Sequence, residues 1–236
     1  MVILWTHFSF AEIDQREILH KSDMARGNLE GVEWKVYIHS IEKGRVQDRK
    51  LDVKARGYDF LAIMTEPPKV KRHKLLMVDH NMWFAKPGVK KPVPVSSRQK
   101  FLGGVSYGDI AATNYANDYQ PTSFTQVTLD GEPCYLFDLK AATKKATYDR
   151  VKYWISQKTI VGVKAEYYTV SGKMFKWATF EFNNRVRLDN NIQPFISKMI
   201  IHDAIVSGDV TTMAFSKPKL VTVPPADLDL NLLMMK

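Results

Sequence analysis

Apolar residues recur along the chain with two different spacings. Residues 12–26 carry them near the helical spacing of about 3.6, and Gly27 follows where a helix would end. From Gly31 the spacing changes to about 2, and the apolar positions of this run are Val32, Trp34, Val36 and Ile38. The pattern predicts an N-terminal helix followed by a strand.

The two-residue spacing continues through most of the remaining chain, interrupted by turn residues. Lys43-Gly44 is one such signal, and Asp130-Gly131 is a strong signal for a hairpin. Residues 79–81 separate two short runs in the same way. About eleven antiparallel strands are expected. Those of the second half are residues 133–142, 151–156, 160–170, 175–182, 195–205 and 210–216.

Residues 82–119 form the one long stretch that breaks this pattern. Its three prolines, at positions 87, 92 and 94, remove backbone donors, so the chain must leave the sheet there. Ser96 with Gln99, and Ser106 with Asp109, have the spacing of capping boxes. We therefore predict that residues 98–113 contain two short helices and form a movable lid. The residues expected to carry it are Phe101, Leu102, Gly103, Gly104, Val105 and Ile110.

A sheet of about eleven strands with short turns should curve strongly or form an open barrel. Such a barrel is wider than the eight-stranded size that side chains fill, so a hydrophobic cavity is expected. The short apolar tail after Pro224-Pro225, residues 228–235, is expected to pack on the mouth of this barrel as a last helical turn. Each inward residue taken singly fits an ordinary core position, and the cavity is predicted from the whole set. The expected lining is Trp34, Val36, Val53, Phe60, Met77, Trp83, Phe137, Val163, Tyr167, Trp177, Phe180 and Met199.

The chain is basic, with 34 Lys and Arg residues, 25 Asp and Glu residues and a net charge of +9. A nucleic-acid surface would combine basic residues with exposed aromatic residues, whereas the aromatic residues here fall mostly on inward positions. Anionic phospholipid headgroups or an acidic membrane partner fit the basic runs better, and simple solvated faces are the alternative. The candidate surface is expected near the mouth of the predicted cavity and consists of Lys71, Arg72, Lys86, Lys90 and Lys91.

The sequence offers no pattern that is typical of catalysis or metal binding. Its six histidines include no pair at a spacing of four, and Cys134 is the single cysteine, best interpreted as a small buried residue. A glycine-rich phosphate loop and a nucleophile elbow are both missing from the sequence. No catalytic residue, metal or cofactor is therefore predicted.

The first residues differ from the rest. Residues 1–10 are apolar, and Ser9-Phe10-Ala11 resembles a signal-peptidase site, which predicts a signal-peptide remnant over residues 1–11. An ordinary N-terminal strand is the alternative. Residues 12–236 are expected to form one domain, and no run of about 18 apolar residues would span a membrane.

Three segments together carry a family resemblance. They are residues 81–115, residues 147–154 (TYDRVKYW) and residues 162–173 (GVKAEYYTVSGK). On these the chain resembles a divergent branch of the LolA-like periplasmic proteins that sort outer-membrane lipoproteins, over about residues 13–233. The resemblance implies a half-closed antiparallel β-barrel whose hydrophobic cavity is covered by helices.

The resemblance also implies a function. The chain is expected to be a periplasmic carrier that binds acyl chains of lipoproteins or lipids and shuttles them towards the outer membrane, in transient contact with a membrane, transporter or acceptor. Because its proline-rich basic insertions depart from the well-known carriers, a lipoprotein, a phospholipid and another acylated lipid all stay open as cargo. The alternatives are a basic protein that binds nucleic acid or other polyanions, and a lipid-modifying hydrolase.

Overall fold

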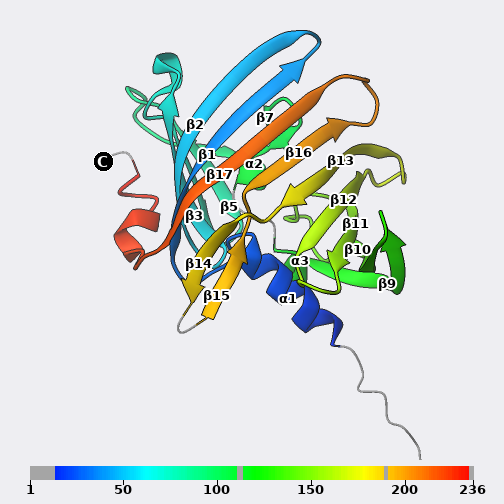
Figure 1. Ribbon diagram of the computed structural model, residues 1–236. Coiled ribbons are helices and arrows are strands. Elements are labelled where there is room, and N and C mark those ends of the chain that lie inside the picture. Colours follow the sequence, from blue (N-terminus) through cyan, green and yellow to red (C-terminus); the bar gives the residue numbers. More distant parts are fainter. Residues whose placement is uncertain (1–13, 111–113, 189–190, 234–236) are drawn as a thin grey trace, which may run out of the picture.

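The computed structural model describes residues 14–110, 114–188 and 191–233 (Figure 1). The predicted signal-peptide remnant lies outside the described residues, as do the last residues of the predicted lid, 111–113.

The N-terminal helix is present where the apolar spacing predicts it. Helix α1 (Gln15–Ala25) begins at Asp14, whose carboxylate accepts hydrogen bonds from the backbone N–H groups of Arg16 and Glu17. This cap satisfies donors that a helix start otherwise leaves free. Gly27, with φ of +115°, turns the chain just beyond the last helical residue.

Most of the chain forms one antiparallel sheet of thirteen strands, in the order β6-β5-β4-β3-β2-β1-β17-β16-β13-β12-β11-β10-β9. Two hairpins, β7–β8 and β14–β15, stand apart from it. In chain order the strands are β1 (Val32–Glu42), β2 (Arg45–Arg56), β3 (Asp59–Glu66), β4 (Lys74–Val78), β5 (Asn81–Ala85), β6 (Val93–Val95), β7 (Lys100–Leu102), β8 (Val105–Ser106), β9 (Tyr119–Leu129), β10 (Glu132–Ala141), β11 (Arg150–Ser156), β12 (Gly162–Tyr168), β13 (Met174–Glu181), β14 (Asn184–Leu188), β15 (Asn191–Phe195), β16 (Lys198–Asp203) and β17 (Val210–Leu220).

The mainly-β prediction is confirmed, but the predicted number of strands was too low. The described residues contain seventeen strands, because several are too short to show alternation. Strand β6 contains Pro94 and is accommodated at the edge of the sheet, where a missing N–H breaks no ladder. Within the described residues β6 and β9 pair on one side only, so the sheet is not closed into a barrel.

The two predicted tight turns are explained by their backbone angles. Asp79 and His80 have φ of +49° and +62°, and Asp130 and Gly131 have φ of +50° and +86°. Two successive positive values match the turn that fits the natural twist of a two-residue hairpin. Both turns therefore join neighbouring strands, β4 to β5 and β9 to β10.

One face of the sheet, which we call the inner face, carries the main hydrophobic core. Val36, Phe137 and Met213 belong to it, from strands on both sides of the sheet. Helix α1, the β7–β8 hairpin, α2 (Tyr107–Ile110) and α3 (Tyr115–Asp118) contribute buried residues to the same core. Figure 1 shows α1 lying across the bent sheet. The inner face is thus covered by elements that interrupt the strand pattern.

The predicted lid is built differently from the two helices that we expected. Lys100–Leu102 and Val105–Ser106 pair as a hairpin that turns at Gly103, whose φ is +53°. The first capping-box prediction was wrong about the helix, although Ser96 N–H does donate to Gln99 Oε1, at 2.9 Å, and closes a turn. The second was right: Ser106 N–H donates to Asp109 Oδ2, at 2.8 Å, and α2 begins there.

The C-terminal segment covers the opposite, outer face instead of the cavity mouth, where we expected it. A short 3-10 helix, η2 (Pro225–Leu228), places Leu228 and Leu233 against Leu61 and Leu76. These two belong to β3 and β4 and point away from the inner face. A second 3-10 helix, η1 (Pro68–Val70), links the same two strands. The apolar outer positions of β3 and β4 are therefore explained by this tail.

Candidate functional site

Nine of the twelve predicted lining residues lie on the inner face. Eight of them are buried members of the main core. Met77 is partly buried and packs against that core. They come from β1, β2, β3, β4, β10, β12, β13 and β16, so the fold brings together positions from both halves of the chain. They are Trp34, Val36, Val53, Phe60, Met77, Phe137, Tyr167, Phe180 and Met199.

The other three predicted lining residues lie elsewhere. Trp83 packs in the outer-face cluster, and Trp177 stacks on His202 with ring centroids 3.9 Å apart. Their neighbours Met82 and Ala178 take the inner positions instead. Val163 stands at an irregularity in the pairing of β11 with β12 and is outside the core. Runs that are apolar on both faces do not reveal which face points inward.

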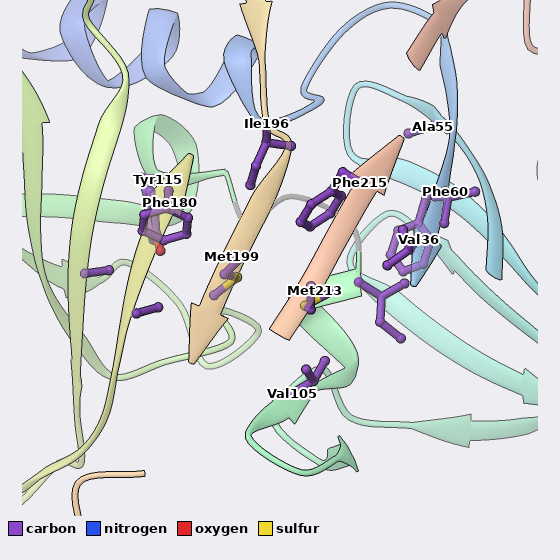
Figure 2. Close-up of a cluster of buried hydrophobic side chains, with 14 of the residues drawn as sticks. Val36, Ala55, Phe60, Val105, Tyr115, Phe180, Ile196, Met199, Met213 and Phe215 are labelled. Carbon is purple, nitrogen blue, oxygen red and sulfur yellow. The ribbon is translucent and has the colours of Figure 1, made fainter. Parts of the chain in front are cut away.

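The predicted lid residues fill the space inside the sheet. Leu102, Val105 and Ile110 are buried in the inner-face core, and Phe101 packs against its margin. Figure 2 shows Val105 from the lid together with Met199 and Met213 of the sheet. In this structure the interior is therefore occupied by the protein's own side chains.

The turn of the lid rests directly on the sheet. A Cβ atom added to Gly103 would overlap Ser40 Oγ and Thr211 Oγ1, and one added to Gly104 would lie 3.4 Å from Ile201 Cβ. Gly104 N–H donates to Thr211 Oγ1 at 2.9 Å. Glycine is required at position 103, where φ is positive and the backbone itself approaches β1 and β17, whereas at position 104 an added Cβ would meet one methyl group, Ile201 Cγ2 of β16, at 2.8 Å.

A buried ion pair holds the lid from below. Lys176 Nζ of β13 lies 2.9 Å from Asp109 Oδ2 of α2 and donates to the Gly104 carbonyl at 2.7 Å. Tyr148 OH donates to the second oxygen of Asp109 at 2.5 Å. Burial lowers the pKa of Lys176, and the charge and hydrogen bond of Asp109 oppose that shift. The pair therefore joins sheet and lid through charged hydrogen bonds in a dry environment.

Sequence reasoning did not identify this pair. Asp109 was recognised only as a capping residue, and Lys176 not at all, although it interrupts an inward row that continues with Ala178 and Phe180. A lysine at an inward position of a strand is a usable signal, because lysine is seldom fully buried without a partner. Its partner, 67 positions away, is not visible in the sequence.

A second polar group lies deep in the same core, at the end of α1. The Arg26 guanidinium lies 4.8 Å from the ring centre of Tyr115 and 5.2 Å from that of Phe180, and the residue is 4% exposed. Asp23 accepts a hydrogen bond from Ala116 N–H at 2.8 Å. Burial raises the pKa of Asp23 to about 7, against the opposing effects of that hydrogen bond and of Arg26.

The predicted basic surface is only partly gathered. Arg72, Lys86 and Lys90 line one surface pocket of about 430 Å³ beside Leu233, and Lys91 is an exposed neighbour of Lys90. Lys71 lines a different pocket. Because Leu233 packs on the outer face, this pocket borders the side of the sheet opposite the lid, whereas we expected it near the cavity mouth.

The described residues present neither a cluster of metal ligands nor a membrane-spanning helix. Within the described parts of the chain, no group of three or more His, Cys, Asp or Glu side chains is arranged to hold a metal ion. In the same residues, every helix is too short or too polar to cross a membrane.

Comparison with solved structures gives close matches over nearly the whole chain. A LolA superfamily protein from Nitrosomonas europaea matches with 28% identity and a TM-score of 0.81, covering 91% of this chain and 96% of that one. A domain from Vibrio parahaemolyticus described as an outer-membrane lipoprotein-sorting protein matches with 17% identity and a TM-score of 0.77, covering 93% and 97%. A DUF1329 family protein from Desulfovibrio piger matches with 18% identity and a TM-score of 0.75, covering 92% of this chain and 97% of that one.

Sequence comparison adds one family and no individual relative. A family model described only as an uncharacterised protein matches residues 57–231. No curated protein matches the sequence. The family match and the agreement in fold with the Nitrosomonas protein lead to one conclusion: the chain belongs to the LolA-like family.

Proposed function

We propose that this protein is a periplasmic carrier that encloses acyl chains of a lipoprotein or lipid on its inner face and delivers them towards the outer membrane. The observation that carries the proposal is the construction of the lid. Leu102, Val105 and Ile110 fill the inner-face core, yet they come from elements of three, two and four residues. Elements this short are not stable alone and depend on the sheet that they cover.

The exchange of lid side chains for acyl chains is energetically reasonable. Each methylene moved out of water contributes about 0.8 kcal/mol, so a few acyl chains compensate for the apolar contacts that the lid gives up. Methionines adapt easily to irregular neighbours. Several of them belong to the inner-face core: Met64, Met82, Met199 and Met213.

A disulfide between lid and sheet tests the proposal. The Cβ positions of Gly104 and Ile201 would lie 3.4 Å apart, close to the separation found in disulfides, and Ile201→Cys removes the Cγ2 atom that the new Cβ would meet at 2.8 Å. We expect the Gly104→Cys/Ile201→Cys protein, with Cys134→Ser to remove the native thiol, to exchange a fluorescent fatty acid slowly when oxidised. Exchange should return on reduction. Stopped-flow fluorescence measures both rates.

The Gly104→Cys/Ile201→Ser/Cys134→Ser protein is the matched control, because it carries the lid substitution, also lacks Ile201 Cγ2 and cannot form the bond. Its exchange rate should not depend on oxidation. If the oxidised double-cysteine protein exchanges ligand as fast as its reduced form, residues 98–110 are not the gate and the proposed route is wrong.

We also propose that the basic surface contacts an anionic membrane or an acidic membrane partner during transfer. Replacing Lys71, Arg72, Lys86, Lys90 and Lys91 by Gln should weaken binding to anionic vesicles and flatten its salt dependence, since each basic residue near such a surface contributes about 1 kcal/mol. Vesicle co-sedimentation across a salt series measures this.

The control for charge is a second Gln variant with the same net charge, in which five exposed basic residues elsewhere are replaced: Lys43, Arg45, Lys158, Lys173 and Arg187. It should bind vesicles more tightly than the first variant. Equal binding by the two variants would mean that net charge alone attracts the protein, and that no defined surface exists.

A further inference from the structure

Arg26 is a buried cation, and two of its three guanidinium nitrogens lack acceptors within the described chain. Its Nε and Nη1 atoms are inaccessible to solvent, and among the residues that the structure describes neither has a hydrogen-bond partner. Asp23, three positions earlier, forms no ion pair with it, and Asp23 Oδ1 is itself unpartnered. Buried polar groups are almost always satisfied, and an unpaired buried charge is strongly unfavourable. The arrangement therefore needs an explanation.

Aromatic rings hold the guanidinium without satisfying it. Tyr115 and Phe180 lie within 5.2 Å of it and offer their faces. The nearby hydroxyls are engaged elsewhere: Tyr153 OH with Ser22 Oγ at 2.8 Å, and Tyr115 OH with Tyr167 OH at 3.4 Å. Ring faces attract a cation but leave its N–H groups free for an incoming acceptor.

Two buried tyrosines connect the arginine to the side chain that holds the lid. Tyr115 touches Arg26 and bonds to Tyr167, and the Tyr167 ring lies 5.1 Å from Lys176 Nζ, which holds the lid. Tyr115 and Phe180 also appear beside Met199 in the core (Figure 2). A ligand that replaces the lid side chains would therefore extend towards Arg26.

We propose that Arg26 anchors the polar end of the bound acyl ligand, its Nε–H and Nη1–H groups donating to a carbonyl or carboxylate oxygen at the end of the chain. This inference rests on the proposed carrier function and adds the chemistry of the ligand. The shared chemistry is the acyl oxygen, supplied by a free fatty acid or by an ester. A guanidinium suits both, because it presents several donors in a fixed plane.

Three probes of similar apolar size separate these possibilities: oleate, methyl oleate and octadecene. Isothermal titration calorimetry should show that the native protein binds oleate and methyl oleate more tightly than octadecene. Arg26→Met should weaken oleate binding by about tenfold or more, methyl oleate less, and octadecene hardly at all, as expected when a charged hydrogen-bond donor is lost. Arg16→Met is the control, because Arg16 is exposed on the same helix.

The outcomes distinguish this inference from the carrier proposal. If the native protein binds octadecene as tightly as oleate, or if Arg26→Met weakens all three probes equally, Arg26 is no anchor while the carrier function stands. If the native protein binds none of the probes, the carrier proposal fails. If Arg26→Met does not fold, Arg26→Lys serves instead: it keeps the buried charge but not the fixed plane of donors, and oleate affinity equal to that of the native protein would overturn the inference.

Discussion

Replacement of Lys176 by Met should lower the free energy of unfolding by about 3–5 kcal/mol, the typical effect of removing one partner of a buried ion pair. The substitution keeps a similar side-chain length but leaves Asp109 buried without its cation and the Gly104 carbonyl without its donor. Among the residues that the structure describes, the hydrogen bonds left to Asp109 would be those from Tyr148 and Ser106. Urea denaturation measures the loss.

Lys198→Met is the matched control. Lys198 Nζ lies 2.8 Å from Glu181 Oε1, compared with 2.9 Å in the buried pair, and the two residues belong to strands of the same sheet. Both side chains are well exposed. Exposed pairs contribute little, so the control should lose less than about 1 kcal/mol. Equal losses in the two variants would show that the Lys176 pair does not hold the lid.

Replacement of Gly103 by Ala should destabilise the protein by about 3 kcal/mol, as the sum of overpacking and an unfavourable positive φ. The added methyl group would overlap Ser40 Oγ and Thr211 Oγ1, which lie 3.0 Å apart and form a hydrogen bond with each other. The lid turn must therefore lift off the sheet. Denaturation measures the stability, and faster amide hydrogen exchange at Val105 would report the lifted lid.

Gly44→Ala separates the backbone effect from the contact. Gly44 also turns a hairpin with positive φ, +72°, but an added Cβ meets nothing within 4 Å. It should lose about 1 kcal/mol and leave exchange in the lid unchanged. If Gly103→Ala behaves like Gly44→Ala, the close approach of the lid to the sheet has no energetic weight. Gly103→Ala should not stabilise the turn by restricting the backbone, because alanine does so only where φ is negative, and φ of Gly103 is +53°.

The two substitutions disturb the same lid through different contacts. Lys176 acts from the inner side of β13 through charge, whereas Gly103 acts at the turn through shape. If the lid is the gate, both variants should also accelerate ligand exchange, in the direction opposite to the oxidised disulfide. Faster exchange in the destabilised lid variants and slower exchange in the oxidised disulfide protein would together link the stability of the lid to the rate of ligand exchange.

Local chemistry was sufficient to predict much of the fold. The apolar spacing predicted the helix within residues 12–26 and the strand that includes residues 32–39. It could do so because apolar side chains that recur on one side of an element reflect burial of that face. The turns at residues 79–81 and at Asp130-Gly131 were also predictable, since they depend on backbone preferences within a few residues. Nine of the twelve lining residues that the alternation predicted lie on the inner face.

Tertiary structure decided the remainder. Whether residues 100–106 form a helical turn or a hairpin depends on the close approach of Gly103 to Ser40 and Thr211, which are distant in the chain. The outer position of Trp83 depends on the C-terminal segment that covers it.

The two buried charges show the limit most clearly. Lys176 finds Asp109 on the lid, while Arg26 finds aromatic rings and no acceptor among the described residues. The sequence by itself determined where strands, turns and the first helix lie, because those depend on neighbours along the chain. Which side chains meet inside the sheet, and which charges stay unpaired there, was decided by contacts between distant segments, and these exist only once the sheet has folded.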